Sequence, residues 1–147
     1  MNDLSKYKHI FIGRVQFSEV DSFGVAHNLK YLYWLEWART DYLRSIGLKM
    51  NPKTFLTEHP IMTVHSEIDY FESCRFNDEY NVYTRISWIK NSSLCFENII
   101  TSEDRLLVKA SSVLVNVNPK TGESVRIDDK LRTLVKKYES DNVQFID

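Results

Sequence analysis

The sequence predicts an α+β fold in which one long helix packs against a face of an antiparallel sheet. Between residues 29 and 46, apolar side chains recur every three or four positions, which is the period of an amphipathic helix. From residue 61 to residue 117, apolar and polar side chains alternate, as they do in antiparallel strands with one buried face. Because the helix lies between the first strand and the others along the chain, we expect the sheet to curl around it.

Length, composition and charge limit the classes of protein to consider. The length of 147 residues predicts one domain that spans residues 1–147. Its 19 basic and 20 acidic residues give a net charge of −1, which indicates neither a nucleic-acid partner nor an anionic membrane. Cys74 and Cys95 lack histidines at ligand spacing, so we expect neither a metal site nor a disulfide. The N-terminal residues contain no apolar run typical of a signal peptide or membrane span, and we expect a cytoplasmic protein.

The first 60 residues supply one strand and the long helix. Alternating side chains predict a strand at His9–Phe17. Asn28 is the predicted N-cap of the helix, which runs to about Ile46, and Gly47 stands where a helix-ending glycine is typical. For the segment Asn51–Pro60 we expect an irregular connection, because a proline stands near each end. The apolar stripe of the helix comprises Leu32, Leu35, Ala38, Tyr42, Leu43 and Ile46.

The rest of the chain predicts a run of strands and a closing helix. Asn118–Gly122 is a strong turn signal, and Ser124–Ile127 is expected to pair back as a short strand. Asp128 is the predicted N-cap of a helix that ends at Tyr138. The four long strands are Ile61–Phe71, Asp78–Ile89, Ser93–Ser102 and Leu106–Val117. In the second of these, one face is expected to carry Tyr80, Val82, Thr84, Ile86 and Trp88, with Ile89 on the other.

The start of the long helix carries a more specific pattern. It reads Phe17-x-x-x-Asp21-x-x-Gly24-Val25-x-His27-Asn28-x-x-Tyr31-Leu32-x-Trp34-Leu35-Glu36-x-Ala38-Arg39. This pattern, with further likeness along residues 9–138, resembles the 4-hydroxybenzoyl-CoA thioesterase family, which comprises acyl-CoA thioesterases of the hotdog fold. The resemblance implies a five- or six-stranded sheet wrapped around the helix. It also implies an enzyme that hydrolyses an acyl-CoA to free acid and CoA without a metal or an organic cofactor.

The resemblance further implies an assembly of several copies. The working unit would be a homodimer with a continuous sheet, often paired again into a dimer of dimers. Each active site would lie between two protomers, with the helix N-terminus of one facing strand residues of the other. A helix N-terminus offers unpaired N–H groups and a partial positive charge, which suit the oxygen of an acyl group.

Asp21 is the predicted catalytic residue. By sequence alone, an aspartate in a turn more often stabilises that turn through bonds to its own backbone. The resemblance assigns Asp21 to the chemistry, either as general base on water or as nucleophile through a mixed anhydride, and the sequence leaves both routes open. Gly24 fits a bend that lets a thioester approach the backbone. The N–H groups around His27 and Asn28 would bind the thioester oxygen, while the His27 side chain could line the acyl pocket or move protons.

Further candidate residues would bind the substrate. Tyr31 would border the acyl tunnel, although an aromatic residue of a helix usually belongs to the core. His65 and Ser66 are neighbours on a strand, so only one of them can face the helix. CoA carries phosphates, and the basic and hydroxyl side chains considered for binding them are Arg75, Arg85, Lys90, Ser92 and Ser93.

Other functions remain open for such a fold. A non-catalytic module would bind acyl-CoA or an acyl carrier and would retain it without turnover. A hotdog dehydratase would need a catalytic histidine in a different motif, which this sequence does not show. A purely structural oligomerising domain would leave Asp21 without a role.

Overall fold

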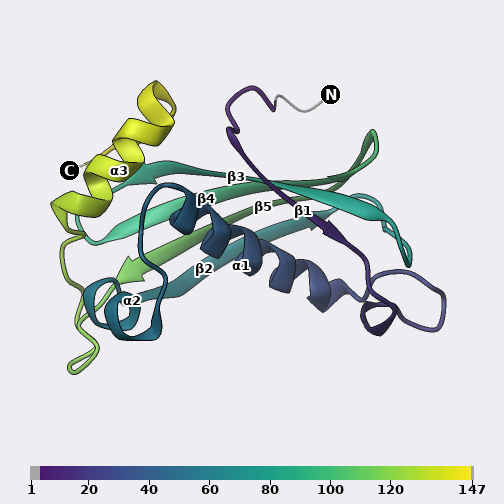
Figure 1. Cartoon of the computed structure of the whole chain (residues 1–147), viewed down its shortest axis with the longest axis horizontal. Coiled ribbons are helices and arrows are strands. Elements are labelled where there is room, and N and C mark those ends of the chain that lie inside the picture. The colour runs from purple at the N-terminus through teal and green to yellow at the C-terminus, as the bar shows by residue number, and fades with distance from the viewer. Residues whose placement is uncertain (1–3, 147) are drawn as a thin grey trace.

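The protein is a curved antiparallel sheet with α1 lying across one of its faces (Figure 1). The computed structural model describes residues 4–146, so residues 1–3 and 147 of the predicted domain lie outside the described part. The strands are β1 (His9–Arg14), β2 (Ile61–Tyr70), β3 (Glu79–Ile89), β4 (Ser93–Ser102), β5 (Arg105–Asn116) and β6 (Gln144–Phe145). The helices are α1 (Asn28–Ser45), α2 (Pro52–Glu58) and α3 (Asp129–Glu139).

The sheet has the strand order β1-β3-β4-β5-β2, and the short β6 lies parallel to β3. The other neighbouring strands run antiparallel. Two clusters of buried side chains fill the space around α1, one centred on Trp34 and Tyr80 and the other on Tyr42 and Phe96. The predicted α+β class, with a six-stranded sheet wrapped around the long helix, is therefore confirmed. In residues 4–146, no helix combines the length and the apolar character that crossing a membrane requires.

Helix α1 begins one residue earlier than predicted. Asn28 is its first helical residue, and the N-cap is His27, whose Nδ1 accepts the Leu29 N–H at 3.3 Å. The imidazole nitrogen is thus the N-cap acceptor, which in other helices is often the side-chain oxygen of an asparagine. The predicted end is confirmed, because Gly47 adopts φ +113° and the Leu48 N–H donates to the Leu43 carbonyl across the last turn.

The buried stripe of α1 differs from the prediction at one position. Leu32 is 40% exposed, whereas Tyr31 and Trp34 are buried. The indole of Trp34 stacks on the ring of Tyr80 with centroids 3.9 Å apart. The large aromatic rings of the first turns therefore occupy the space against the middle of the sheet, and Leu32 lies partly exposed at the border between α1 and β2. The remaining residues of the predicted stripe are buried.

Strand β3 contains a bulge that reverses the predicted orientation of its last residues. Pairing with β4 shifts register between Ile86 and Trp88. One extra residue in a strand inverts the face to which later side chains point. Ile89 is therefore fully buried and Trp88 is only half-buried, so both predictions for these residues were wrong.

Three connections also differ from the predictions. The segment after α1 is not irregular but contains α2, whose first residue is Pro52, because proline suits the first position of a helix. β1 ends at Arg14 instead of Phe17, and a short 3₁₀ turn follows. Ser124 makes an isolated bridge with Val117 rather than starting a strand. The predicted Asp128 cap is confirmed, since its Oδ1 accepts the Leu131 N–H at 2.9 Å.

Candidate active site

The loop between β1 and α1 forms a small hairpin, and Asp21 is the residue that starts its turn. Val20 and Ala26 pair as an antiparallel bridge, and the Asp21 N–H donates to the Val25 carbonyl at 2.9 Å. The Gly24 N–H donates back to the Asp21 carbonyl at 2.9 Å. Gly24 adopts φ +77°, a conformation that side chains disfavour, so the bend depends on glycine. The hairpin therefore holds Asp21 in the loop directly before the long helix.

The Asp21 carboxylate partly stabilises its own turn. Its Oδ1 accepts the Phe23 N–H at 2.8 Å and the Val25 N–H at 3.4 Å, as an aspartate in a turn commonly does. Oδ2 has no hydrogen-bond partner within residues 4–146. The side chain is exposed in the single chain. One oxygen therefore fixes the orientation of the carboxylate and the other is available to a substrate or a water molecule.

The first N–H groups of α1 are not equally available. The His27 N–H donates to the Glu19 carbonyl at 2.8 Å, and the Leu29 N–H is bound by the His27 ring. The Lys30 N–H donates to the His27 carbonyl. The Asn28 N–H, at the first position of the helix, has no partner in the described part of the chain. Of the N–H groups at the two predicted positions, that of His27 is therefore occupied and that of Asn28 is free within the described residues.

Arg75 is the CoA-binding candidate that the fold brings to this hairpin. It bridges Val25, and the neighbouring Phe76 N–H donates to the Gly24 carbonyl at 3.2 Å. Three exposed aromatic rings surround the same place: Phe17, Phe23, which is 82% exposed, and Phe76. These rings were not among the predicted site residues, although several phenylalanines around one turn are visible in the sequence. A thioester-sized ligand at the hairpin would lie beside a cation and apolar rings.

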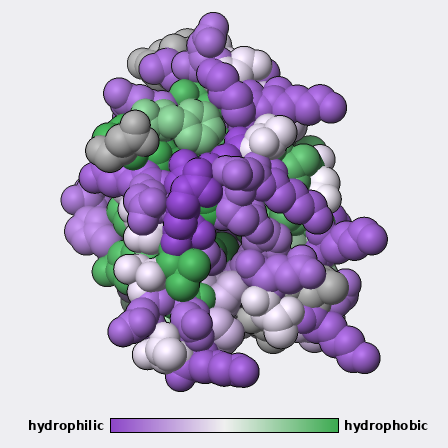
Figure 2. Space-filling model, turned by 90° about the vertical axis from the view of Figure 1, so that its left-hand side faces the viewer, coloured by the Kyte–Doolittle hydropathy of each residue, from purple (hydrophilic) through white to green (hydrophobic). Residues whose placement is uncertain are grey.

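Lys90, Ser92 and Ser93 lie at the other end of the sheet. They form the β3–β4 turn, where the guanidinium of Arg132 on α3 donates to the Lys90 carbonyl at 2.7 Å. Figure 1 places α3 at the end of the molecule opposite to the hairpin. That end has a mostly hydrophilic surface with separate hydrophobic patches (Figure 2). Within one chain, these three residues are therefore not brought to Asp21.

Ser66 and His65 point to opposite sides of β2. A register shift between Thr63 and His65 turns Ser66 toward α1, where its Oγ lies 3.4 Å from the Ser112 Oγ. His65 is exposed and its Nε2 lies 3.4 Å from a Glu67 carboxylate oxygen. Ser66 is therefore the member of the pair that faces the helix.

Two adjoining grooves lie between α1 and the strands β2 and β5. The first has a volume of about 180 Å³ and includes Ser66, Leu32 and Ile68 in its lining. The second, of about 200 Å³, includes Phe55. Arg39 lines both grooves, and burial lowers the pKa of its guanidinium. The grooves combine apolar and polar lining residues, and the charged pair Arg39 and Glu36 belongs to both of them.

Tyr31 belongs to the core rather than to these grooves. It is 3% exposed, and its hydroxyl accepts the Cys74 N–H at 3.2 Å. Burial raises the pKa of the phenol. In the part of the chain that the structure describes, His, Cys, Asp and Glu side chains form no group of three or more that could hold a metal ion.

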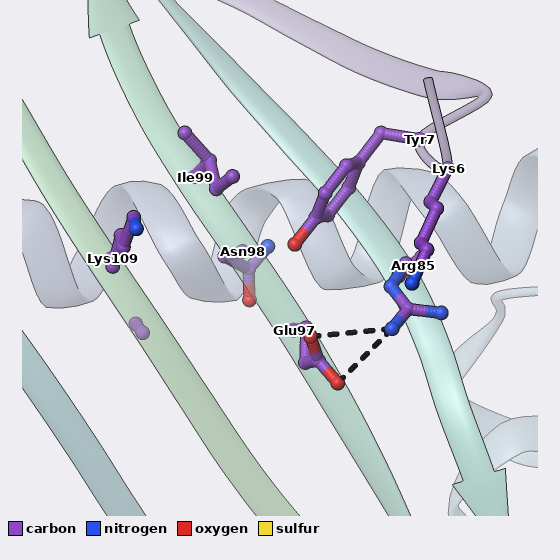
Figure 3. Close-up of a pocket in the computed structure, with 8 residues that line it drawn as sticks. Lys6, Tyr7, Arg85, Glu97, Asn98, Ile99 and Lys109 are labelled. Carbon is purple, nitrogen blue, oxygen red and sulfur yellow. Dashed lines mark hydrogen bonds and ion pairs between the residues drawn. The ribbon is translucent and has the colours of Figure 1, made fainter. Parts of the chain in front are cut away.

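A further hollow of about 280 Å³ lies on the opposite face of the sheet (Figure 3). Arg85 and Glu97 stand in front of the strands with a helix behind them, and Tyr7 reaches over from the N-terminal segment. The Arg85 guanidinium is 3.3 Å from both Glu97 carboxylate oxygens and donates to the Asn142 carbonyl at 2.8 Å. Arg85 is therefore engaged in holding the chain ends to the sheet.

Comparison with known proteins places this fold and hairpin in a family. Residues 15–135 match the thioesterase-like superfamily. The chain is 32% identical over 100 residues to an acyl-CoA thioesterase YbgC of Haemophilus influenzae, a match that covers 67% of this chain and 72% of the relative. It is 28% identical to an acyl-CoA thioester hydrolase YbgC of Escherichia coli, over 72% of this chain and 79% of the relative.

The fold agrees with solved structures. A hypothetical protein from Aquifex aeolicus superposes with a TM-score of 0.79 at 25% identity, covering 86% of this chain and 98% of that one. The family match spans the Asp21 hairpin, α1, α2 and the strands β2 to β5. The resemblance drawn from the start of the helix is thereby confirmed at the level of the superfamily. This chain belongs to the thioesterase-like superfamily.

Proposed function

We propose that this protein hydrolyses acyl-CoA thioesters to a free carboxylic acid and CoA. The names of the two YbgC relatives support this substrate class. One observation carries the proposal: Asp21 sits on a hairpin that leads directly into α1, whose Asn28 N–H has no partner in residues 4–146. A carboxylate in the loop that leads to such an N–H, at the positive end of a helix, suits attack on a carbonyl group.

The proposed reaction uses these two groups and water. The thioester oxygen would accept the Asn28 N–H, which stabilises the negative charge that develops on it. Asp21 would either take a proton from the attacking water or attack the carbonyl carbon itself, forming an anhydride that water then opens. In both routes a carbon–oxygen bond forms, the carbon–sulfur bond breaks, and the leaving thiolate takes up a proton as CoA.

We infer that a second copy of the chain completes the site. Asp21 and the rings of Phe17, Phe23 and Phe76 are exposed in a single chain, which leaves the hairpin open to solvent. The edge strand β2 also exposes apolar side chains, including Val64 at 59%. Pairing of two β2 strands would extend the sheet and would close the α1–β2 grooves over an acyl group.

This assembly would also bring in the remaining candidate residues. Arg75 beside the hairpin would meet a CoA phosphate from its own chain. Lys90, Ser92 and Ser93 lie at the far end of the sheet, so they would contribute from the partner copy. The grooves near Ser66 would hold the acyl chain.

The decisive experiment measures release of free thiol from a panel of aliphatic and aromatic acyl-CoAs. Wild-type protein should release thiol, and Asp21→Asn should lower kcat by roughly 10²–10⁴-fold, the range for loss of a general base. The exposed Asp141→Asn is the matched control and should retain wild-type kcat. A wild-type protein that retains acyl-CoA in a binding assay but releases no thiol would establish the non-catalytic module instead.

A further inference from the structure

Glu19 is a buried carboxylate beneath the hairpin that carries Asp21. Its side chain bonds in two directions: Oε2 accepts the Trp34 indole N–H at 2.8 Å, and Oε1 accepts the Gln16 N–H at 2.9 Å. Its backbone carbonyl accepts the His27 N–H at 2.8 Å. The residue is 6% exposed and forms no ion pair within residues 4–146. One residue thus connects the start of the loop, the helix and the last residue before the helix.

These bonds place the hairpin relative to the helix. The Val20–Ala26 bridge starts directly after Glu19 and ends directly before His27, so Glu19 and His27 form the base of the hairpin. Trp34 is fully buried and stacked on Tyr80, which makes it a fixed reference in the core. The distance from Asp21 to the helix N-terminus is therefore set through Glu19.

The same bonds also decide which backbone donor is free. Because the Glu19 carbonyl binds the His27 N–H, that group cannot serve a ligand, and the Asn28 N–H is left as the available donor. Burying a carboxylate is costly unless it is well hydrogen-bonded. The carboxylate nevertheless occupies the base of the loop that holds Asp21, where two N–H donors satisfy it.

We propose that Glu19 is a positioning residue for hydrolysis, which holds Asp21 and the Asn28 N–H in their reactive arrangement through Trp34 and His27. The inference builds on the proposed function and deepens it. Glu19 does not touch the thioester, and its effect passes through the hairpin. Reacting groups must be held to within about half an ångström of their productive positions, so a loosened hairpin lowers turnover.

Glu19→Gln tests the proposal with almost no change in shape. A carboxamide has one oxygen and one NH₂ group, so either the Gln16 N–H or the Trp34 indole N–H would face another donor. We expect kcat to fall by roughly 10–10²-fold, in the range that misplacement of reacting groups causes, while KM stays nearly unchanged. Amide hydrogen exchange should become faster across residues 20–28, with little change in α3.

A double-mutant cycle with Trp34→Phe checks the route of the effect. This substitution removes the indole N–H and keeps an aromatic ring, so it should lower kcat in the wild-type background. In the Glu19→Gln background its effect should be smaller, because the two substitutions break the same connection. Strictly additive effects would contradict positioning through Trp34.

Glu139→Gln is the matched control for a merely structural role. Glu139 is also fully buried and accepts two hydrogen bonds, from the Tyr42 hydroxyl and the Ile86 N–H. Whatever this control does to the melting temperature, its kcat should match the wild type. If Glu139→Gln and Glu19→Gln lowered kcat equally, or if Glu19→Gln retained wild-type kcat, the inference would be overturned.

Hydrogen exchange separates this inference from the proposed function. A wild-type protein that releases no thiol would refute the hydrolase, whatever Glu19 does. Unchanged exchange across residues 20–28 in Glu19→Gln would refute the positioning role, even in an active enzyme. Faster exchange confined to that segment, together with the fall in kcat, would support both.

Discussion

The buried carboxylates Glu19 and Glu139 show how single residues are accommodated in this core. Neither forms an ion pair within residues 4–146, and each accepts two hydrogen bonds. Both bonds to Glu139 reach Oε2, and its buried Oε1 has no partner among the described residues. For Glu139, burial raises the pKa, and the bonds from Tyr42 and Ile86 together with the nearby charges of Arg85 and Lys8 only partly oppose this.

The raised pKa of Glu139 predicts a pH dependence of stability. The folded protein binds this proton more tightly than the unfolded chain, so the stabilisation is complete below the ordinary carboxyl pKa. It is lost as the pH rises from that value through the folded pKa. Urea unfolding at a series of pH values should therefore show a decline in the unfolding free energy across this window. In Glu139→Gln the decline should be smaller, and an unchanged pH profile would contradict this account.

At the scale of elements, two helix caps fix where α1 ends and where α3 begins. The Schellman-type turn at Gly47 ends α1 beside α3, where Leu134 is the nearest side chain to the glycine. Asp128 caps α3 through the Leu131 N–H, and its other oxygen lies 3.6 Å from the buried His59. These local bonds let α3 close one end of the core against α1.

Removal of the α3 cap should destabilise the protein by a predictable amount. Asp128→Ala leaves the Leu131 N–H without its acceptor, and we expect a loss of about 1 kcal/mol in unfolding free energy. Asp128→Asn keeps an acceptor oxygen and should retain most of the stability, which isolates the cap from the contact with His59. Urea midpoints of the three proteins measure both effects. Equal stability of Asp128→Ala and wild type would refute the role of the cap.

At the scale of the whole molecule, the two edges of the sheet differ in what lies beside them. β1 and β2 are the edge strands of the five-strand path, and the grooves and the exposed β2 side chains share the α1–β2 side. At the end of β2, the Tyr70 hydroxyl donates to the Asn28 carbonyl at 3.3 Å, which connects this edge with the start of α1. A strand edge with exposed apolar side chains is a natural place for pairing with another chain. The proposed dimer therefore involves the edge that also borders the candidate site.

The dimer proposal predicts different outcomes at the two edges. Val64→Glu on β2 would place like charges near each other in the paired sheet, so sedimentation should show a shift toward monomer and thiol release should fall. Ile12→Glu on β1 is the matched control, because its 60% exposure is close to the 59% of Val64. That variant should keep the assembly of the wild type. A Val64→Glu protein that remains fully dimeric and active would place the interface elsewhere.

Much of the architecture followed from the sequence. The period of α1, its end at Gly47, the cap at Asp128 and the extent of β4 depend on neighbours close along the chain, so local patterns report them. The motif around Asp21 likewise indicated the superfamily, because its spacing is written in consecutive residues.

The tertiary structure alone decided how these elements meet. The bulges after Ile86 and Thr63 arise from pairing with neighbouring strands, and a two-residue alternation cannot report where one residue is inserted. They bury Ile89 and turn Ser66 toward the helix. The Asn28 N–H is the free one because the Glu19 carbonyl accepts the N–H of His27, eight residues further along the chain. Contacts between distant segments thus fixed the details of the site, since such contacts exist only once the chain has closed on itself.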